Sequence, residues 1–416
     1  MKTAEQKADK KAGSMELKDT LAKLLENEPP YEEIQYFIRE VEDYFSEEEF
    51  ARPDHKVIVL GTSVPEEFIY ASGTSPYWIL GGSLEMAQWA DDELPRDTDP
   101  VSRSMFGHLL KQLSLCASDS LIIIPVVGDS SRKMAYLLRR AGKKVHTIDI
   151  PPVKDRFAIR KWDRQLELFG EALSQHTGKR ITKHSLQEAS DKVANARIEM
   201  QQFLKASNGK LGELEGSYRM FLLGSYYCSA DITEWTWNMH QLNARLTELP
   251  MQTEEPDRNN VLLMGSPIYF PNFKIPFLLQ EVGMNLCANV DYTIQKSFAI
   301  PASWKKRKVD FYRLFHRFYK KDCSSAYIQN RAMLDSIVRL IGEKQIDGVV
   351  YHVLKGQIEY DFELEWFEQL FSKYEIPVFR LETDYNYQDI EQLRIRMEAF
   401  MEVLTQRKYS RKAAVL

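Results

Sequence analysis

Polar side chains follow two apolar runs of the chain, and their types could perform acid–base chemistry or bind an anion. Gly128 and Asp129 come shortly after SLIIIP (120–125), and His352, Lys355 and Gln357 lie at or beyond the end of DGVVYHVL. A histidine can act as a general acid or base near neutral pH. A histidine at the end of a strand can equally be a hydrogen-bonded structural residue, so both interpretations of His352 stay open.

Other candidate sites carry weaker chemical signals. The turns Gly61-Thr62-Ser63 and Gly81-Gly82 could each hold a phosphate at a helix N-terminus, although ordinary strand-to-helix turns look the same. Residues 304–321 mix basic and aromatic side chains, which is typical of a nucleic-acid patch, a basic rim for coenzyme A, or a solvated helix over an aromatic core. The sequence contains no nucleotide-binding glycine motif, zinc-protease motif or serine-hydrolase motif.

The elements that position these residues alternate between strands and helices. Short apolar, β-branched runs predict buried strands, and helix-length segments separate them. Residues 154–250 contain no strand signal and predict a helical region. The whole pattern predicts an α/β protein with two parallel sheets, in which the polar strand ends face one cleft. The predicted strands are 55–61, 77–82, 120–125, 143–150, 259–267, 285–293, 347–354 and 376–384.

The same pattern predicts five segments in the chain. The charged N-terminus has no apolar core, which predicts a disordered tail rather than a secretory signal. The predicted segments are a tail (1–14), N-terminal helices (15–54), a first α/β domain (55–153), a helical linking region (154–255) and a second α/β domain (256–416).

Charge and cysteine content limit the partners and the compartment that the chain can have. The net charge of −5 gives no reason to expect nucleic acid as a partner, and no apolar run approaches the roughly 20 residues of a membrane span. The four cysteines are scattered and form no CxxC pair, so we expect a reduced, cytoplasmic protein.

Five stretches, taken in order, resemble one known family. They are VLGTSVPEEFIYASGTSPYWILGG (59–82), SDSLIIIPVVGDSSRKM (118–134), TGKRIT (177–182), the segment from Cys323 to Gly356, and the segment 376–404. Together they resemble the 2-hydroxyacyl-CoA dehydratase and benzoyl-CoA reductase family of iron–sulfur proteins. The resemblance implies two flavodoxin-like domains with a 4Fe–4S cluster between them, and a dimer.

The three positions that hold cluster-binding cysteines in this family carry other residues here. The resemblance places Asp99 or Pro100 at the first position, Gly128 at the second and Gln357 at the third. Because cluster iron is held by soft thiolates, we expect no iron–sulfur cluster and no other metal. Gly128 is then the residue left where an iron ligand stands in the family, or simply a good turn residue.

Two functions follow from this resemblance. The first is a cluster-free subunit that pairs as a homodimer, or as a heterodimer with a cysteine-complete relative, and contributes an interface and a pocket for a coenzyme A ester. The second is a stand-alone enzyme that uses the former cluster cleft, with His352 as the proton-transfer group. Asp129, Lys355 and Gln357 are the expected substrate-binding residues in either case. A weaker third interpretation is a sensor or structural protein without a ligand.

Overall fold

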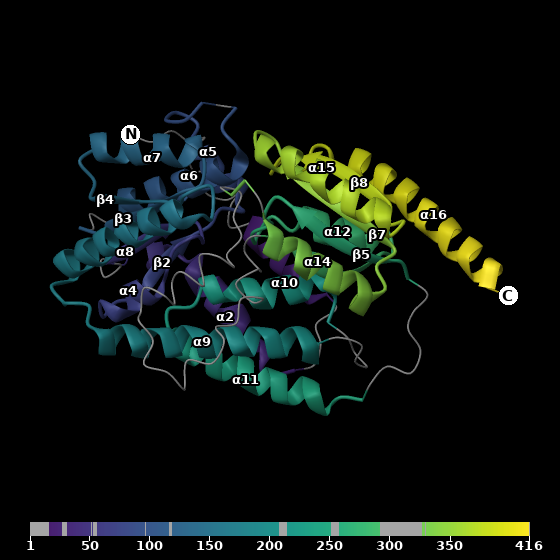
Figure 1. Cartoon of the computed structure of the whole chain (residues 1–416), viewed down its shortest axis with the longest axis horizontal. Helices are drawn as coiled ribbons and strands as arrows, with labels where there is room; N and C mark the ends of the chain where they lie inside the picture. Colours follow the sequence, from purple (N-terminus) through teal and green to yellow (C-terminus); the bar gives the residue numbers. More distant parts are fainter. Residues whose placement is uncertain are drawn as a thin grey trace.

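The computed structural model contains one parallel four-stranded sheet in each half of the chain (Figure 1). The first sheet has the strand order β2-β1-β3-β4, and the second has the order β6-β5-β7-β8. Counted within its own half, each sheet therefore runs 2-1-3-4, the order of flavodoxin-like folds. The structure describes residues 16–26, 31–50, 52, 56–95, 97–115, 119–207, 214–250, 258–291, 327–328 and 330–415.

The strands form where apolar, β-branched runs can be buried on both faces. All four residues of β1 and all seven of β7 are buried, as expected for central strands of a parallel sheet. The edge strands β4 and β8 are only partly buried. The bounds are β1 (Val57–Leu60), β2 (Pro76–Ile79), β3 (Leu121–Val126), β4 (Val145–Asp149), β5 (Asn260–Gly265), β6 (Asn285–Val290), β7 (Gly348–Leu354) and β8 (Val378–Thr383).

The helices belong to three groups along the chain. Residues 16–25 are also helical and precede the first group. The first half of the chain contains α2 (Ile34–Tyr44), α3 (Glu47–Phe50), α4 (Glu67–Ala71), α5 (Leu84–Gln88), α6 (Pro100–Leu115) and α7 (Asp129–Arg140). The linking region contains α8 (Arg156–Thr177), α9 (Lys183–Ala206), α10 (Gly216–Gly224), a 3₁₀ turn (Ser225–Tyr227) and α11 (Ile232–Glu248). The second sheet carries α12 (Lys274–Glu281), α14 (Arg331–Lys344), α15 (Ile358–Lys373) and α16 (Ile390–Val415).

Local capping explains where the long linking helices begin and end. The Asp155 carboxylate accepts hydrogen bonds from the backbone N–H groups of Phe157 and Ala158 and so starts α8. Gly178 follows α8 with a φ of 71°, a left-handed conformation that glycine adopts without strain. Thr182 and Ser185 cap the start of α9 reciprocally. The predicted helical region is therefore confirmed, with its first break inside TGKRIT.

A buried ionic cluster ties α9 to the first sheet. Glu66, directly before α4, is fully buried, and its carboxylate lies 3.1 Å from the guanidinium of Arg197 on α9. Arg197 also lies 3.3 Å from Glu67, and the hydroxyl of Tyr226 donates to Glu66 over 2.7 Å. Burial opposes the charge of Arg197, but the two carboxylates outweigh burial and raise the pKa of the guanidinium. The cluster thus anchors the Pro-Glu-Glu turn to the linking helices, with one guanidinium shared by two carboxylates.

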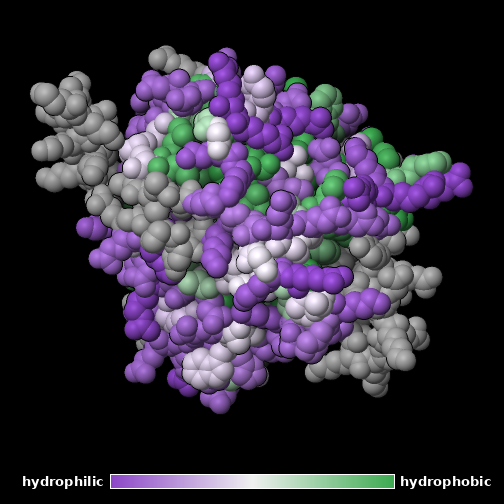
Figure 2. All heavy atoms as spheres, turned by 90° about the vertical axis from the view of Figure 1, so that its left-hand side faces the viewer, coloured by the Kyte–Doolittle hydropathy of each residue, from purple (hydrophilic) through white to green (hydrophobic). Residues whose placement is uncertain are grey.

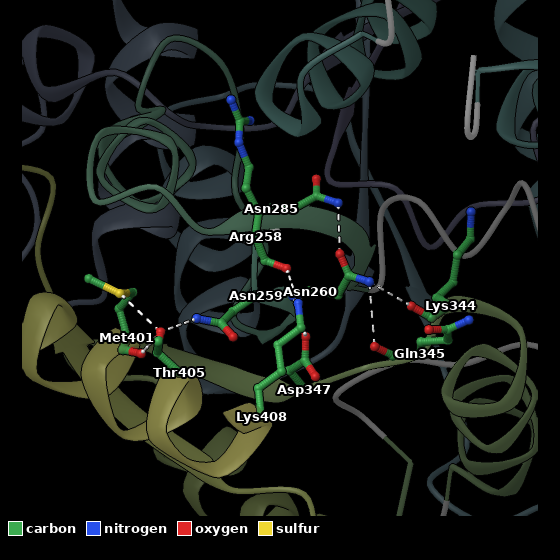
Figure 3. A network of polar contacts seen from close by, with 10 residues as sticks. All are labelled: Arg258, Asn259, Asn260, Asn285, Lys344, Gln345, Asp347, Met401, Thr405 and Lys408. Carbon is green, nitrogen blue, oxygen red and sulfur yellow. Dashed lines mark hydrogen bonds and ion pairs between the residues drawn. The ribbon is translucent and has the colours of Figure 1, made fainter. Parts of the chain in front are cut away.

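The amino-terminal edge of the second sheet is joined to α16 by a network of polar contacts (Figure 3). The backbone N–H of Asn260, at the start of β5, donates to Asp347 over 2.8 Å, and its side-chain oxygen accepts from Asn285 over 2.9 Å. Asn259 donates to Thr405 on α16 over 2.8 Å. All these contacts lie within the second half of the chain, so this edge supports the domain itself.

The predicted α/β architecture with two parallel sheets is confirmed, and every predicted strand is present with slightly shifted ends. Helix α15 was not predicted, because apolar side chains occur on more than one of its faces. The basic and aromatic segment 304–321 lies outside the described residues. No described helix is both long enough and apolar enough to span a membrane.

Candidate functional site

The three positions that the resemblance assigns to cluster ligands lie at the starts of three helices. Asp99 precedes α6, Gly128 is the N-cap of α7, and Gln357 is the N-cap of α15. Each helix start presents backbone N–H groups that favour negative charge. The first two helices belong to the first half of the chain and the third belongs to the second half, so the site lies between the two sheets.

Asp99 is the centre at which these helix starts meet. Its Oδ1 accepts hydrogen bonds from the backbone N–H of Ser102 over 2.9 Å and from Nε2 of Gln357 over 3.2 Å. Its Oδ2 accepts from the hydroxyl of Ser130, two residues after Gly128, over 3.2 Å. The carboxylate is therefore bonded to neutral donors from all three chain segments. We call Asp99, Gly128, Ser130 and Gln357 the Asp99 cluster.

Gly128 leaves space in this cluster. Its φ of −169° is an extended conformation that any residue can adopt, and a Cβ atom built there would meet no atom within 4 Å. Its backbone N–H donates a hydrogen bond to the hydroxyl oxygen of Ser131, which completes the cap of α7. A larger side chain would therefore fit at position 128 without strain.

Gln357 is buried, with 8% of its surface exposed, and only one end of its side-chain amide forms a hydrogen bond. Its Nε2 donates to Asp99, but its Oε1 is buried and has no hydrogen-bond partner among the described residues. A buried, unpaired amide oxygen is uncommon in folded proteins and costs free energy. The preceding Gly356 has a φ of 83°, and a Cβ atom there would lie 3.2 Å from the carbonyl oxygen of Asp97. The two halves of the chain are therefore in close contact at this point.

The donor set of the Asp99 cluster does not fit an iron–sulfur cluster. Positions 99, 128 and 357 offer one carboxylate, no side chain and one amide, whereas cluster iron requires thiolates. Pro100 would offer no ligand atom either. Among the described residues, no group of three or more His, Cys, Asp or Glu side chains is arranged to hold a metal ion.

His352 lies inside the second sheet and is closed off from solvent. It is a residue of β7 with 3% of its surface exposed, and its Nε2 lies 2.6 Å from the hydroxyl of Thr383 on β8. Burial lowers the pKa of His352 to about 3, with a further contribution from the nearby Lys274 ammonium. His352 is therefore neutral at physiological pH. Asp129 and Lys355 are exposed on either side of the Asp99 cluster.

The glycine turn after β2 is packed against protein. A Cβ atom on Gly82 would lie 2.5 Å from the carbonyl oxygen of Tyr269 and 2.6 Å from that of Phe270. The N–H of Gly82 donates to the hydroxyl of Tyr385 over 3.1 Å. Carbonyl oxygens at this distance repel a phosphate, so the Gly81-Gly82 turn functions as a contact between the two halves.

A cavity of about 510 Å³ lies beside this contact and was not predicted. The helix of residues 16–25, α5, α12 and the segment that begins α16 enclose it. Most of its inner surface is apolar and comes from Leu84, Phe277, Leu278, Tyr387 and Ile390. The polar and charged side chains that also line it are Glu16, Asp19, Thr20, Lys23, Glu85, Gln88, Lys274 and Glu281.

Two of the charged groups that line this cavity, Lys274 and Glu16, are already paired. Lys274 Nζ donates to the carbonyl oxygens of Asp384 and Asn386 and lies 2.9 Å from the Asp389 carboxylate. Glu16 accepts from Ser83 and from the backbone of Leu84, and burial raises its pKa. Most of the inner surface of this cavity is apolar. The N-terminal helix borders the cavity with Glu16, Asp19, Thr20 and Lys23, so the apolar periodicity of this helix gave no signal for it.

Comparison with known proteins relates nearly the whole chain to one family. The sequence model described as 2-hydroxyglutaryl-CoA dehydratase, D-component, matches residues 62–404. That range includes every described strand except β1, together with the linking helices and the Asp99 cluster.

Three curated relatives are similar over most of their length. "Putative dehydratase subunit YjiM" of Escherichia coli strain K12 is 25% identical over 356 residues, which is 82% of this chain and 90% of the relative. The (R)-phenyllactyl-CoA dehydratase beta subunit of Clostridium sporogenes is 22% identical over 361 residues, 82% of this chain and 89% of the relative. The (R)-2-hydroxyglutaryl-CoA dehydratase beta subunit of Acidaminococcus fermentans is 23% identical over 363 residues, 82% of this chain and 90% of the relative.

Proposed function

The chain belongs to the 2-hydroxyglutaryl-CoA dehydratase D-component family, and we propose that it is a cluster-free subunit of a 2-hydroxyacyl-CoA dehydratase-type system. In this role it pairs with a cysteine-complete relative and contributes an interface and part of an acyl-CoA pocket. The observation that carries the proposal is the Asp99 cluster, where three ligand positions come together without a thiolate.

The convergence supports the assignment of these three positions. Residues 99, 128 and 357 are distant in sequence, yet Asp99 contacts Gln357 directly and reaches the residue two places after Gly128. Hydrogen bonds between Asp99, Ser130 and Gln357 occupy the place of iron ligation. A subunit with this site keeps the scaffold for pairing and leaves electron transfer to its partner.

The apolar cavity between the two halves supports the acyl-CoA part of the proposal. Its volume of about 510 Å³ lies within the range of small-molecule pockets. Apolar walls formed by Phe277, Leu278 and Ile390 suit the hydrocarbon part of an acyl group. The predicted residues Asp129 and Lys355 do not line this cavity, and we retain them as expected contacts for the polar part of the ligand.

Iron analysis tests the cluster-free state. The protein is purified anaerobically, reconstituted with iron and sulfide, and measured for bound iron, acid-labile sulfide and visible absorption. We expect no stoichiometric cluster. A matched variant that combines Asp99→Cys, Gly128→Cys and Gln357→Cys should gain iron under the same conditions, because Gly128 leaves space for a side chain. A near-stoichiometric cluster in the natural chain would overturn the proposal.

An activity measurement tests the subunit role. The isolated chain should neither dehydrate nor reduce a 2-hydroxyacyl-CoA, and it should co-purify with a cysteine-complete relative. Robust turnover by the metal-free, partner-free chain would support the stand-alone enzyme instead. The mainly apolar surface of this cavity is the observation that favours this second function. Free Cys228 and Cys287 suit a reducing compartment, and we expect a cytoplasmic location.

A further inference from the structure

An open cavity of about 710 Å³ lies between the loop before β2 and the turn that joins α8 to α9. The ring Nε2 of His176, at the end of α8, lies 2.9 Å from the carbonyl oxygen of Lys56, directly before β1, so this turn lies at the amino-terminal edge of the first sheet. The Asp99 cluster follows the carboxyl ends of the strands and is therefore a separate site. We call this space the α8–α9 cavity, and the side chains that could bind a ligand there are Tyr70, Thr74, Ser75, Lys179, Arg180 and Lys192.

The α8–α9 cavity is positively charged within an acidic chain. Three cationic side chains, Lys179, Arg180 and Lys192, line it together with one carboxylate, that of Glu188. This local excess of positive charge contrasts with the net charge of −5 of the whole chain. The end of the molecule that carries the turn between α8 and α9 faces the viewer in Figure 2, and its surface is predominantly hydrophilic apart from local apolar patches. A polar, positively charged cavity attracts a small anion.

Two of the three cations have no charged partner in the protein. Lys192 Nζ lies 3.3 Å from the Asp231 carboxylate and 5.1 Å from the ring centre of Tyr70, so its charge is already engaged. Lys179 and Arg180 are exposed and form no ion pair with any residue that the structure describes. A guanidinium can donate two parallel hydrogen bonds to one phosphate, and an ammonium adds a second positive charge. These neighbouring free cations suit two phosphate groups on one ligand.

The loop before β2 supplies neutral donors next to these cations. A Cβ atom on Gly73 would lie 2.6 Å from Lys179 Nζ, so the ammonium lies directly over this loop. The φ of 77° at Gly73 also favours glycine. The hydroxyls of Thr74 and Ser75, and that of Tyr70, form no hydrogen bond within the described part of the chain. Each of them can donate to a phosphate oxygen.

We propose that the α8–α9 cavity binds a diphosphate group, either free or as part of a phosphorylated small molecule. Lys179 and Arg180 contact the phosphate oxygens, and the hydroxyls of Thr74 and Ser75 fix their position. The volume of about 710 Å³ leaves room for an organic part as well. The cavity is bordered by α4 and α9, which the Arg197 contact with Glu67 also joins, so the bound ligand stabilises the folded chain.

Isothermal titration calorimetry with inorganic pyrophosphate, at about 50 mM salt to limit screening, tests the site. We expect saturable binding, and Lys179→Ala with Arg180→Ala should raise the Kd by about tenfold or more, because charge-assisted hydrogen bonds are lost. Arg160→Ala with Lys161→Ala is the matched control, since it removes the same two charges from exposed positions on α8, roughly 24 Å along the helix from its end. No binding to the natural chain, or equal losses in the two double variants, would overturn the proposal.

Removal of the hydroxyls separates a defined site from general charge attraction. Thr74→Val with Ser75→Ala leaves every charge in place and should still weaken pyrophosphate binding by about threefold or more. Pyrophosphate should also raise the midpoint of thermal unfolding of the natural chain but not that of the variant without Lys179 and Arg180. Unchanged affinity after loss of both hydroxyls would reject the site.

A comparison of ADP with pyrophosphate distinguishes the two forms of the ligand. Tighter binding of ADP would assign the cavity to an organic diphosphate, whereas equal or weaker binding would assign it to the free diphosphate. The proposal does not depend on the dehydratase role, because the site uses neither the Asp99 cluster nor the apolar cavity. These experiments need neither iron nor a partner subunit, so their failure would leave the dehydratase proposal standing.

Discussion

Two buried carboxylate sites lie beside the first sheet, and their partners differ in kind. Glu66 is bonded to the Arg197 guanidinium and the Tyr226 hydroxyl, and it lies next to Glu67. Asp99 is bonded to a backbone N–H, a serine hydroxyl and a glutamine amide, all of them neutral. The first site contains a matching cation, whereas the second site contains none among the bonds of its carboxylate.

These different partners indicate different roles. The Glu66 cluster stabilises the fold, whereas the Asp99 cluster stands where the resemblance places iron ligands. The Glu66 cluster joins elements of the first half and the linking region, and its buried guanidinium attracts two carboxylates. The Asp99 cluster joins three helix starts from both halves, and it leaves Gln357 Oε1 unpaired. We therefore expect the first site to dominate stability, and the second site to tolerate substitution and control the contact between the halves.

The largest effect should come from Arg197→Ala. It leaves two buried carboxylates without their cation, and breaking a buried pair costs about 3–5 kcal/mol. Urea unfolding followed by circular dichroism would measure this loss. Arg164→Ala is the control, because the Arg164–Glu167 pair is exposed on α8 and should contribute almost nothing. Equal losses in the two variants would remove the distinction between the buried anchor and a surface pair.

The next largest effect should come from Gly82→Ala at the contact between the halves. The new methyl group would meet the carbonyl oxygens of Tyr269 and Phe270, and the φ of 91° is strained for alanine. Backbone strain alone costs about 1–3 kcal/mol. Gly128→Ala is the matched glycine substitution in open space and should change the free energy of unfolding by less than about 0.5 kcal/mol. A large loss from Gly128→Ala would contradict the open space at that position.

Acid should destabilise the protein through His352. Its folded-state pKa of about 3 lies below the ordinary value of 6.5, so between these values the unfolded chain binds a proton that the folded chain excludes. Stability is thus present above pH 6.5 and is lost as the pH falls toward 3. Between pH 7 and pH 5 the natural chain should lose about 2 kcal/mol more than His352→Gln. Parallel losses in both proteins would show that His352 is not buried in the neutral form.

The smallest effect should come from Gln357→Met. This substitution removes one hydrogen bond to Asp99 but also removes the unpaired amide oxygen, so the net cost should stay below about 1 kcal/mol. Urea unfolding of Gln357→Met and of Arg197→Ala under the same conditions compares the two sites directly. A loss as large as that of Arg197→Ala would show that the Asp99 cluster is an anchor as well.

The sequence predicted strands better than the contacts between them. Apolar, β-branched runs are unambiguous, which explains why β3 and β7 were placed to within one residue at each end. Helix α15 was missed because Phe362 and Trp366 interrupt the amphipathic pattern, and these are the side chains that give the helix its second apolar face. The pattern fails at this helix because its exposed face and its core face are both apolar.

The Asp99 cluster could be predicted in part. The resemblance named positions 99, 128 and 357, but only the fold shows that Ser130 bonds to Asp99 and that Gln357 reaches across from the other half. The apolar cavity depends on Glu16, Lys274 and Ile390, which lie far apart in sequence. Periodicity can identify an apolar face on each helix, but it cannot pair such faces over these separations.

The helix of residues 16–25 closes the cavity between the two halves, and this has a consequence for synthesis on the ribosome. Lys23 pairs with Glu281 and lies over the ring of Phe277, while Tyr387 and Ile390 complete the surface that receives the helix. At about 5–20 residues per second, on the order of 20 to 70 seconds pass between translation of this helix and completion of its binding site. The apolar face of the helix stays without its complete binding site during that interval. We therefore expect nascent chains to depend on chaperones until the last strand and α16 have emerged.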